Sequence, residues 1–188
     1  MERTQQPEEE EECSICLDGL PKDATKFARA ACCGKAMHVK CRDGVLASSM
    51  SYKQKNQCVM CRTKYPGSDK EKIEQLLSWV EKAQAWAQSM LGQRYCHGVG
   101  VDQSYQQARE LFELSATQGN ISAQYSLGVM YQEGQGVDQS YERAAEYYEA
   151  AARQGHASAQ YNLGLRYGKG QGVKQSNEKA RELWMKSA

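Results

Sequence analysis

Apolar residues in the second half of the chain recur every three to four positions, the spacing of one face of an α-helix. Ala123, Leu127 and Tyr131 lie four apart, and the segment "GQG" that follows ends the helix because glycine readily adopts turn conformations. Ser140 can then cap a return helix. The inner face of that helix would carry Ala144, Tyr148 and Ala151 or Ala152. The pattern predicts a unit of two helices.

This unit is repeated at an offset of 36 residues. Residues 84–119 and 120–155 are identical at 18 of 36 positions, and a third copy follows. Self-similarity at such a period indicates a helical array. A glycine lies inside the first helix of each unit, at Gly92, Gly128 and Gly164, where it costs about 1 kcal/mol relative to alanine. We expect these glycines to permit close approach of neighbouring helices.

A further helix is expected before the first unit. The segment "PGSD" breaks the chain and offers Ser68 or Asp69 as a helix cap. The stretch 70–82 then lies where the 36-residue repeat would place the second helix of an earlier unit. Its apolar residues are Ile73, Leu76, Leu77 and Val80. We expect residues 67–82 to form a linker and capping helix for the array.

The array resembles the Sel-1-like repeat, a relative of the tetratricopeptide repeat, through the pattern A-x3-LG-x2-Y-x2-G-x-GV and the alanines that follow it. The resemblance covers residues 83–188, as units 83–118, 119–154 and 155–188. It implies a curved α-solenoid of helix-turn-helix repeats that binds proteins and carries no catalytic residues. The third unit stops at Ala188 without the "QG" of the others, so either the chain is a fragment or its last helix ends bare.

Composition and charge exclude several classes of function. The formal net charge is +1, so the chain lacks the global basic field that would attract nucleic acid or anionic lipid. Residues 1–12 are acidic, with little to bury, and predict a solvated, disordered tail. They do not form a secretory signal, and the sequence has no run long enough to span a membrane. We expect an intracellular protein, cytoplasmic or nuclear.

Cysteines are concentrated at the front of the chain, where seven of eight lie between residues 13 and 61. The cytosol keeps thiols reduced, so metal ligation is favoured over a disulfide framework. Two C-x2-C pairs are the strong part of this signal, because such spacing lets both thiolates face one tetrahedral zinc. A redox role for "CVMC" would need a βαβ context, which the pattern lacks. With His38, the segment offers eight ligands, enough for two closed zinc sites.

Residues 13–66 resemble the RING finger, through "CSICLDGL", "CCGKAMHVKC" and "CVMCR". The resemblance implies an interleaved cross-brace of ligands. The first zinc would take Cys13, Cys16, His38 and Cys41, and the second would take Cys32, Cys33, Cys58 and Cys61. A domain of fewer than about 70 residues with a thin apolar core usually needs extra stabilisation, such as disulfides or a bound metal, and structural zinc contributes on the order of 10 kcal/mol.

The second ligand pair departs from the family pattern. A common RING places a histidine where Lys35 stands, and a protonated lysine cannot bind zinc, so the adjacent Cys32 is the natural substitute. Neighbouring cysteines can share an ion only if the backbone turns sharply, which Gly34 favours. We expect both cysteines to bind zinc, the alternative being one ligand and one buried bystander.

The RING resemblance implies a ubiquitin ligase without a nucleophile of its own, because the reactive cysteine belongs to the ubiquitin-conjugating enzyme. Family positions that contact the conjugating enzyme and ubiquitin map to Ile15, Val59 and Arg62, although Val59 stands where a proline is usual and Ser48 where many ligases carry an aromatic residue. The repeats would select or assemble an unknown protein substrate. The alternative is a non-catalytic adaptor whose zinc finger is an interaction module. RNA binding would need basic and aromatic residues interleaved, which are missing.

Several other residues are expected to have structural roles and not functional ones. Cys96 and His97 do not recur in the other units, so a metal site there is not expected. The tyrosines at equivalent positions, Tyr95, Tyr131 and Tyr167, are expected in the core, and His156 is expected in a turn at the place of Asn120. The G-x-GV segments follow helices and lack the lysine and serine of a phosphate-binding loop.

Overall fold

The structure is a computed structural model, and it describes residues 27–29, 36–38 and 67–187. The chain divides into two compact units, one containing strands β1 and β2 and the other containing helices α3 to α9. Over 67–187 the chain is mainly helical, which confirms the expected α-solenoid. In the part of the chain that the structure describes, no helix is both long and apolar enough to cross a membrane.

A short antiparallel ladder joins β1, Phe27–Arg29, to β2, Ala36–His38. His38, a candidate zinc ligand, is the last residue of β2 and lies opposite Phe27. The other candidate zinc ligands lie outside the described residues, and so do the positions expected to contact a conjugating enzyme. These residues are Cys13, Cys16, Cys32, Cys33, Cys41, Cys58 and Cys61, together with Ile15, Val59 and Arg62.

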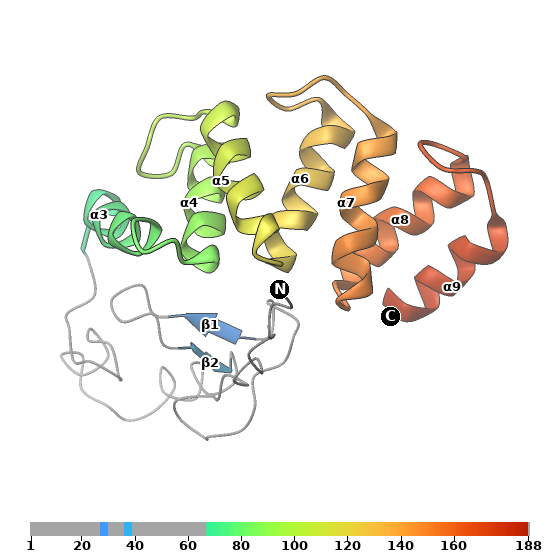
Figure 1. The fold of residues 1–188 in the computed structure, drawn as a ribbon, viewed down its shortest axis with the longest axis horizontal. Coiled ribbons are helices and arrows are strands. Elements are labelled where there is room, and N and C mark those ends of the chain that lie inside the picture. Colours follow the sequence, from blue (N-terminus) through green and yellow to red (C-terminus); the bar gives the residue numbers. More distant parts are fainter. Residues whose placement is uncertain (1–26, 30–35, 39–66, 188) are drawn as a thin grey trace, which may run out of the picture. The chain divides into compact units, whose positions relative to one another are not determined.

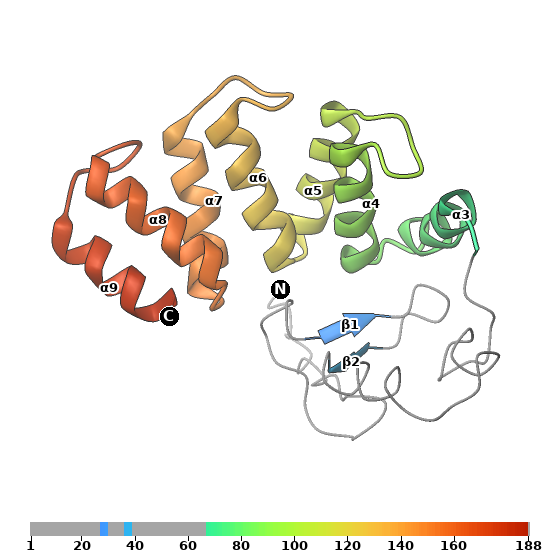
Figure 2. The same ribbon diagram turned by 180° about the vertical axis from the view of Figure 1, so that it is seen from behind.

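Helix α3, Asp69–Val80, precedes three pairs of helices. The pairs are α4 (Ala85–His97) with α5 (Tyr105–Thr117), α6 (Ile121–Glu133) with α7 (Tyr141–Arg153), and α8 (Ala157–Lys169) with α9 (Asn177–Ser187). The two helices of each pair pack together, and each second helix also packs on the first helix of the next pair. The pairs follow one another in chain order in Figure 1 and, from behind, in Figure 2.

Serines begin the second helices at a spacing of 36 residues. The hydroxyl oxygens of Ser104, Ser140 and Ser176 accept hydrogen bonds of 3.2–3.3 Å from the backbone N–H three residues later, as N-cap residues do. Ser68 makes the same bond at the start of α3, to the N–H of Glu71 at 3.2 Å. The expected caps at Ser68 and Ser140 are thus confirmed, and α3 starts in the register of a second helix.

Glycines end the first helices. Gly98, Gly134 and Gly170 follow α4, α6 and α8 with left-handed φ angles of 64°, 70° and 65°. The expected stop of the helix before "GQG" is therefore confirmed at Gly134. A left-handed φ costs other L-residues roughly 1–2 kcal/mol, which explains why glycine stands at this position of every unit.

The glycines inside the first helices lie against aromatic rings of the second helices. An added Cβ would lie 2.7 Å from Phe112 at Gly92, 2.6 Å from Tyr148 at Gly128 and 2.5 Å from Trp184 at Gly164. Real Cβ atoms essentially never come this close to another heavy atom. The expected close approach is thus confirmed, and its physical form is a large ring packed directly on the helix backbone.

Helix α3 closes the start of the array. Its buried residues Ile73 and Leu76 pack with Ala87 and Leu91 of α4 in one apolar cluster. Leu77, which belongs to the same apolar stretch of sequence, is 40% exposed instead. Two further clusters lie along the array, one around Ala108, Phe112 and Leu127 and one around Ala144, Tyr148 and Leu163. The core therefore runs as a series of linked clusters between successive helices.

Candidate protein-interaction surface

The second helices α5, α7 and α9 border two hollows, each with residues of an intervening first helix in its lining. The α5/α7 hollow measures about 370 Å³ and is lined by Arg109 of α5, Tyr131 of α6 and Arg143 of α7, with residues 136–138 of the loop and Ser140, the N-cap of α7. The α7/α9 hollow measures about 250 Å³. Concave sites lined by a few polar groups are where proteins commonly bind ligands and peptide side chains.

Arg143 is held in the α5/α7 hollow by Tyr131. Its Nη1 donates a 2.8 Å hydrogen bond to the hydroxyl oxygen of Tyr131, and its guanidinium carbon lies 5.1 Å from the centre of the Tyr131 ring. The ring of Tyr147 stacks on the same tyrosine, with centroids 5.6 Å apart and an interplanar angle of 11°. Burial raises the pKa of the Tyr147 hydroxyl, which keeps this phenol neutral at physiological pH.

Arg109 carries the second positive charge of the α5/α7 hollow. Its Nη1 lies 3.6 Å from a carboxylate oxygen of Glu113, and its buried Nε has no acceptor within the described residues. Asp138 also lines the hollow. Because two carboxylates accompany the two guanidinium groups, this hollow has no excess of positive charge and does not favour an anion.

The α7/α9 hollow has an apolar floor and a charged rim. Gln160, Leu163 and Tyr167 of α8 line it, with Lys179, Glu182, Leu183 and Lys186 of α9 on one side and Glu149, Ala152 and Arg153 of α7 on the other. The ammonium group of Lys179 lies 4.9 Å from the centre of the Tyr167 ring. Arg153 and Glu149 pair with each other at 2.7 Å. This arrangement suits an apolar side chain surrounded by polar groups.

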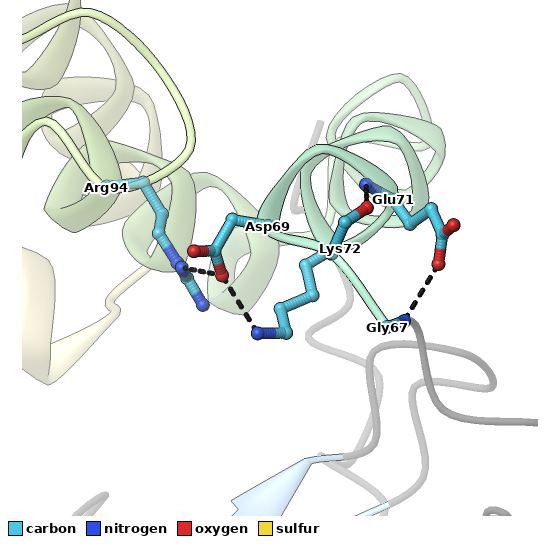
Figure 3. Close-up of polar contacts among 6 residues, drawn as sticks. Gly67, Asp69, Glu71, Lys72 and Arg94 are labelled. Carbon is cyan, nitrogen blue, oxygen red and sulfur yellow. Dashed lines mark hydrogen bonds and ion pairs between the residues drawn. The ribbon is translucent and has the colours of Figure 1, made fainter.

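Polar contacts fasten α3 to α4 (Figure 3). A carboxylate oxygen of Asp69 lies 2.8 Å from Nζ of Lys72 and 3.6 Å from Nη1 of Arg94. The hydrogen bond from Lys72, with its charge and that of Arg94, holds the pKa of Asp69 below its ordinary value. Glu71 accepts a 2.8 Å hydrogen bond from the N–H of Gly67, so the chain entering α3 is also held.

The tyrosines at equivalent positions belong to the core, as the sequence indicated. Tyr131 is buried, and Tyr95 and Tyr167 are partly buried against the neighbouring apolar clusters. Cys96 is half-buried, and burial raises the pKa of its thiol, which keeps it protonated and poorly reactive at neutral pH. Within the described residues, no three His, Cys, Asp or Glu side chains gather in a way that could hold a metal ion.

His156 was expected only as a turn residue, but in the structure it also caps a helix. It is the N-cap of α8, its Nδ1 accepts a 3.2 Å hydrogen bond from the N–H of Ala159, and it is only 6% exposed. Its ring stacks on Tyr125 at 4.5 Å between centroids. The equivalent residue Asn120 caps α6 in the same way, and this equivalence was the signal that could have identified the cap.

Comparisons with known proteins agree with this architecture. A family model described as the Sel1 repeat matches residues 87–120, 121–156 and 157–188. A Sel1 repeat protein from Oxalobacter formigenes is 26% identical, with a TM-score of 0.61 over 63% of this chain and 47% of that one. A protective antigen of uropathogenic Escherichia coli strains that displays an SLR fold is 30% identical, with a TM-score of 0.62 over 66% of this chain and 26% of that one.

A third solved structure, Helicobacter pylori cysteine rich protein B, is similar in fold, at 21% identity and a TM-score of 0.52 over 64% of this chain and 90% of that one. The chain therefore spans about half of the Oxalobacter protein's length and about a quarter of the Escherichia coli protein's length. A search of curated proteins finds no match.

Proposed function

We propose that this chain, which belongs to the Sel1 repeat family, is a RING-type ubiquitin-protein ligase. Its helical repeats form a protein-interaction scaffold, which in this proposal selects or assembles substrates. The observation that carries the proposal is the set of seven cysteines and His38, in the order and spacing of a RING finger. The repeats then supply what a ligase needs beside its zinc finger, a surface that binds another protein.

The donor set fits two zinc ions. Seven thiolates and one imidazole make eight ligands of the types that zinc prefers, enough for two four-coordinate sites. In the proposed arrangement one site takes Cys13, Cys16, His38 and Cys41, and the other takes Cys32, Cys33, Cys58 and Cys61. When bound, zinc supplies folding free energy to a segment with a thin apolar core.

The proposed ligase acts by positioning. Ile15, between two ligands, offers an apolar contact to the conjugating enzyme, with Val59 as a neighbouring contact position. Arg62 follows the last ligand, and its guanidinium can donate several hydrogen bonds at once to carbonyl groups of the conjugating enzyme and ubiquitin. Holding two reactants in a reactive pose lowers the barrier without any nucleophile from this chain.

A reconstituted ubiquitination reaction tests the proposal. The purified chain is mixed with activating enzyme, a panel of conjugating enzymes, ubiquitin and ATP, and ubiquitin chains formed on the protein itself are measured. We expect activity with some conjugating enzymes, a sharp loss in Arg62→Ala with both zinc ions retained, and weaker enzyme docking in Ile15→Ala. Arg181→Ala, an exposed arginine of α9, is the matched control and should keep full activity.

The second candidate function is a non-catalytic adaptor. Val59 in place of a proline and Ser48 in place of an aromatic residue favour it, because both substitutions alter the surface offered to a conjugating enzyme. A zinc-loaded protein that is inactive with every conjugating enzyme of the panel would support the adaptor and contradict the ligase.

A further inference from the structure

We propose that the α7/α9 hollow binds an aromatic side chain of a partner segment whose flanking residues are acidic. This inference rests on the proposed function in one respect, since it names the kind of segment that a substrate would offer to the repeats. It concerns residues 149–186 alone, so it can be tested without any ubiquitin transfer.

The preceding unit shows how a ring can pack on the tyrosine of the hollow, whereas the first unit has Leu111 in the place of Tyr147. In the preceding unit, Tyr147 of α7 stacks on Tyr131 at 5.6 Å and packs against the cluster that contains the fully buried Leu127. The equivalent residues one unit later are Leu183, Tyr167 and Leu163. Leu183 has no ring to stack on Tyr167, and these three residues line the hollow of about 250 Å³. A partner's aromatic ring would occupy on Tyr167 the place that Tyr147 occupies on Tyr131.

Charges on the rim favour acidic residues on both sides of the aromatic one. Lys179 and Lys186 are seven positions apart on α9, about 10 Å along the helix, and both line the hollow. Neither forms an ion pair with a described residue, and Arg153 on the opposite side is paired with Glu149. Glu182 lies between the two lysines, so a partner's carboxylates are favoured at the two ends of the site and not at its centre. Complementary rim charges give specificity and faster association.

Binding of short synthetic peptides to the full-length chain tests the proposal. The probes are fluorescein-labelled peptides with a central Trp, Tyr, Phe or Ala, flanked by glutamates, serines or lysines, and fluorescence anisotropy reports their affinity. We expect the aromatic, glutamate-flanked peptides to bind best, with the alanine and lysine-flanked peptides at least about tenfold weaker. Equal binding of aromatic and alanine peptides, or a preference for lysine flanks, would overturn the proposal.

Two sets of variants locate the site. Leu183→Tyr installs the ring that Tyr147 provides in the preceding unit, and it should lower affinity at least about tenfold without lowering the melting temperature. Lys179→Glu with Lys186→Glu should weaken the glutamate-flanked peptides by a similar factor and remove most of the salt dependence. Arg181→Glu, the same charge change on an exposed position of α9 outside the lining, should bind as the parent does. Unchanged binding by a folded Leu183→Tyr protein would refute the assignment, whatever the result of the ubiquitination reaction.

Discussion

The ring of Tyr148 packs directly on the backbone of Gly128: a Cβ added at Gly128 would lie 2.6 Å from Cδ1 of that ring. Tyr148 is fully buried, which raises the pKa of its hydroxyl, and that hydroxyl lies 3.1 Å from Oε1 of Gln132, to which it donates a hydrogen bond. The ring is therefore enclosed by packing and held at its polar end, so it cannot move aside for a larger residue at position 128.

Gly128→Ala should lower the free energy of unfolding by roughly 1–3 kcal/mol, because the cost of overpacking exceeds the gain of about 1 kcal/mol in helix propensity. Urea unfolding followed by circular dichroism measures the change. Gly168→Ala is the matched control in α8, where the added Cβ would meet its nearest neighbour at an ordinary 3.8 Å and no left-handed φ is required. That variant should be as stable as the parent or more stable. Equal effects of the two substitutions would contradict the explanation.

Ala83 stands where the other units have glycine. Its φ angle is 54°, and the equivalent residues Gly119 and Gly155 have φ angles of 80° and 87°. We expect Ala83→Gly to stabilise the array by about 0.5–1 kcal/mol, because the relief of backbone strain exceeds the added entropy of the unfolded chain. Thermal or urea unfolding measures it.

Gly155→Ala provides the reverse experiment. No atom lies within 4 Å of the Cβ that would be added there, so any loss of stability comes from the backbone conformation alone. We expect a loss of roughly 1–2 kcal/mol. A stabilised Gly155→Ala protein, or a destabilised Ala83→Gly protein, would show that the left-handed turn is not what selects glycine.

Zinc content follows from the eight-ligand count. Purified protein should contain two zinc ions per chain, and a strong chelator should unfold residues 13–66 while the repeats remain helical, because apolar clusters hold α3 to α9 together. Metal analysis and far-ultraviolet circular dichroism before and after chelation provide the measurement. One zinc per chain would contradict the assignment of both Cys32 and Cys33.

Single substitutions then examine the neighbouring cysteines. Cys32→Ser and Cys33→Ser should each lose one zinc and unfold the zinc-binding segment, since a closed four-ligand site depends on every thiolate. Lys35→Ala should keep both ions and serves as the control. If Cys32→Ser retains two zinc ions, Cys33 binds alone and the fourth ligand of that site lies elsewhere in the chain.

Asp69 should make the stability of the helices at the start of the array depend on pH. Its pKa is held below the ordinary value of 3.8 by Lys72 and Arg94, so its stabilising effect is present above that value and is lost as the pH falls through the lowered one. Asp69→Asn should therefore lower the melting temperature of the helices slightly at neutral pH and not at strongly acidic pH. The difference should also shrink in high salt, as expected for an exposed ion pair. A difference that is the same at both pH values would exclude a charge effect.

The helical part of the fold could be predicted because each unit repeats its own boundary signals. Ser140 and Gly134 delimit helices through short-range hydrogen bonds and backbone conformation, which depend on a few adjacent residues. The role of His156 was missed because histidine is an unusual cap, although its alignment with Asn120 indicated it.

The hollows could not be predicted in the same way. Tyr147 and Leu183 are both large apolar residues at equivalent positions, and nothing in the pattern shows that Tyr147 stacks on the tyrosine of its unit while Leu183 lines an open hollow. The hydrogen bonds between the glutamines of neighbouring units, Gln118 with Gln88 and Gln154 with Gln124, were equally hidden, because they form only when the helices are packed.

The sequence by itself therefore determined the period of the array, the ends of its helices and the number and type of the candidate zinc ligands, since these depend on residue identity and local spacing. Tertiary structure decided which rings lie on which glycines, where the hollows open and which buried polar atoms lack a partner. Those properties depend on the shapes of side chains brought together from different helices, and a one-residue difference such as Tyr147 against Leu183 changes them without altering the pattern.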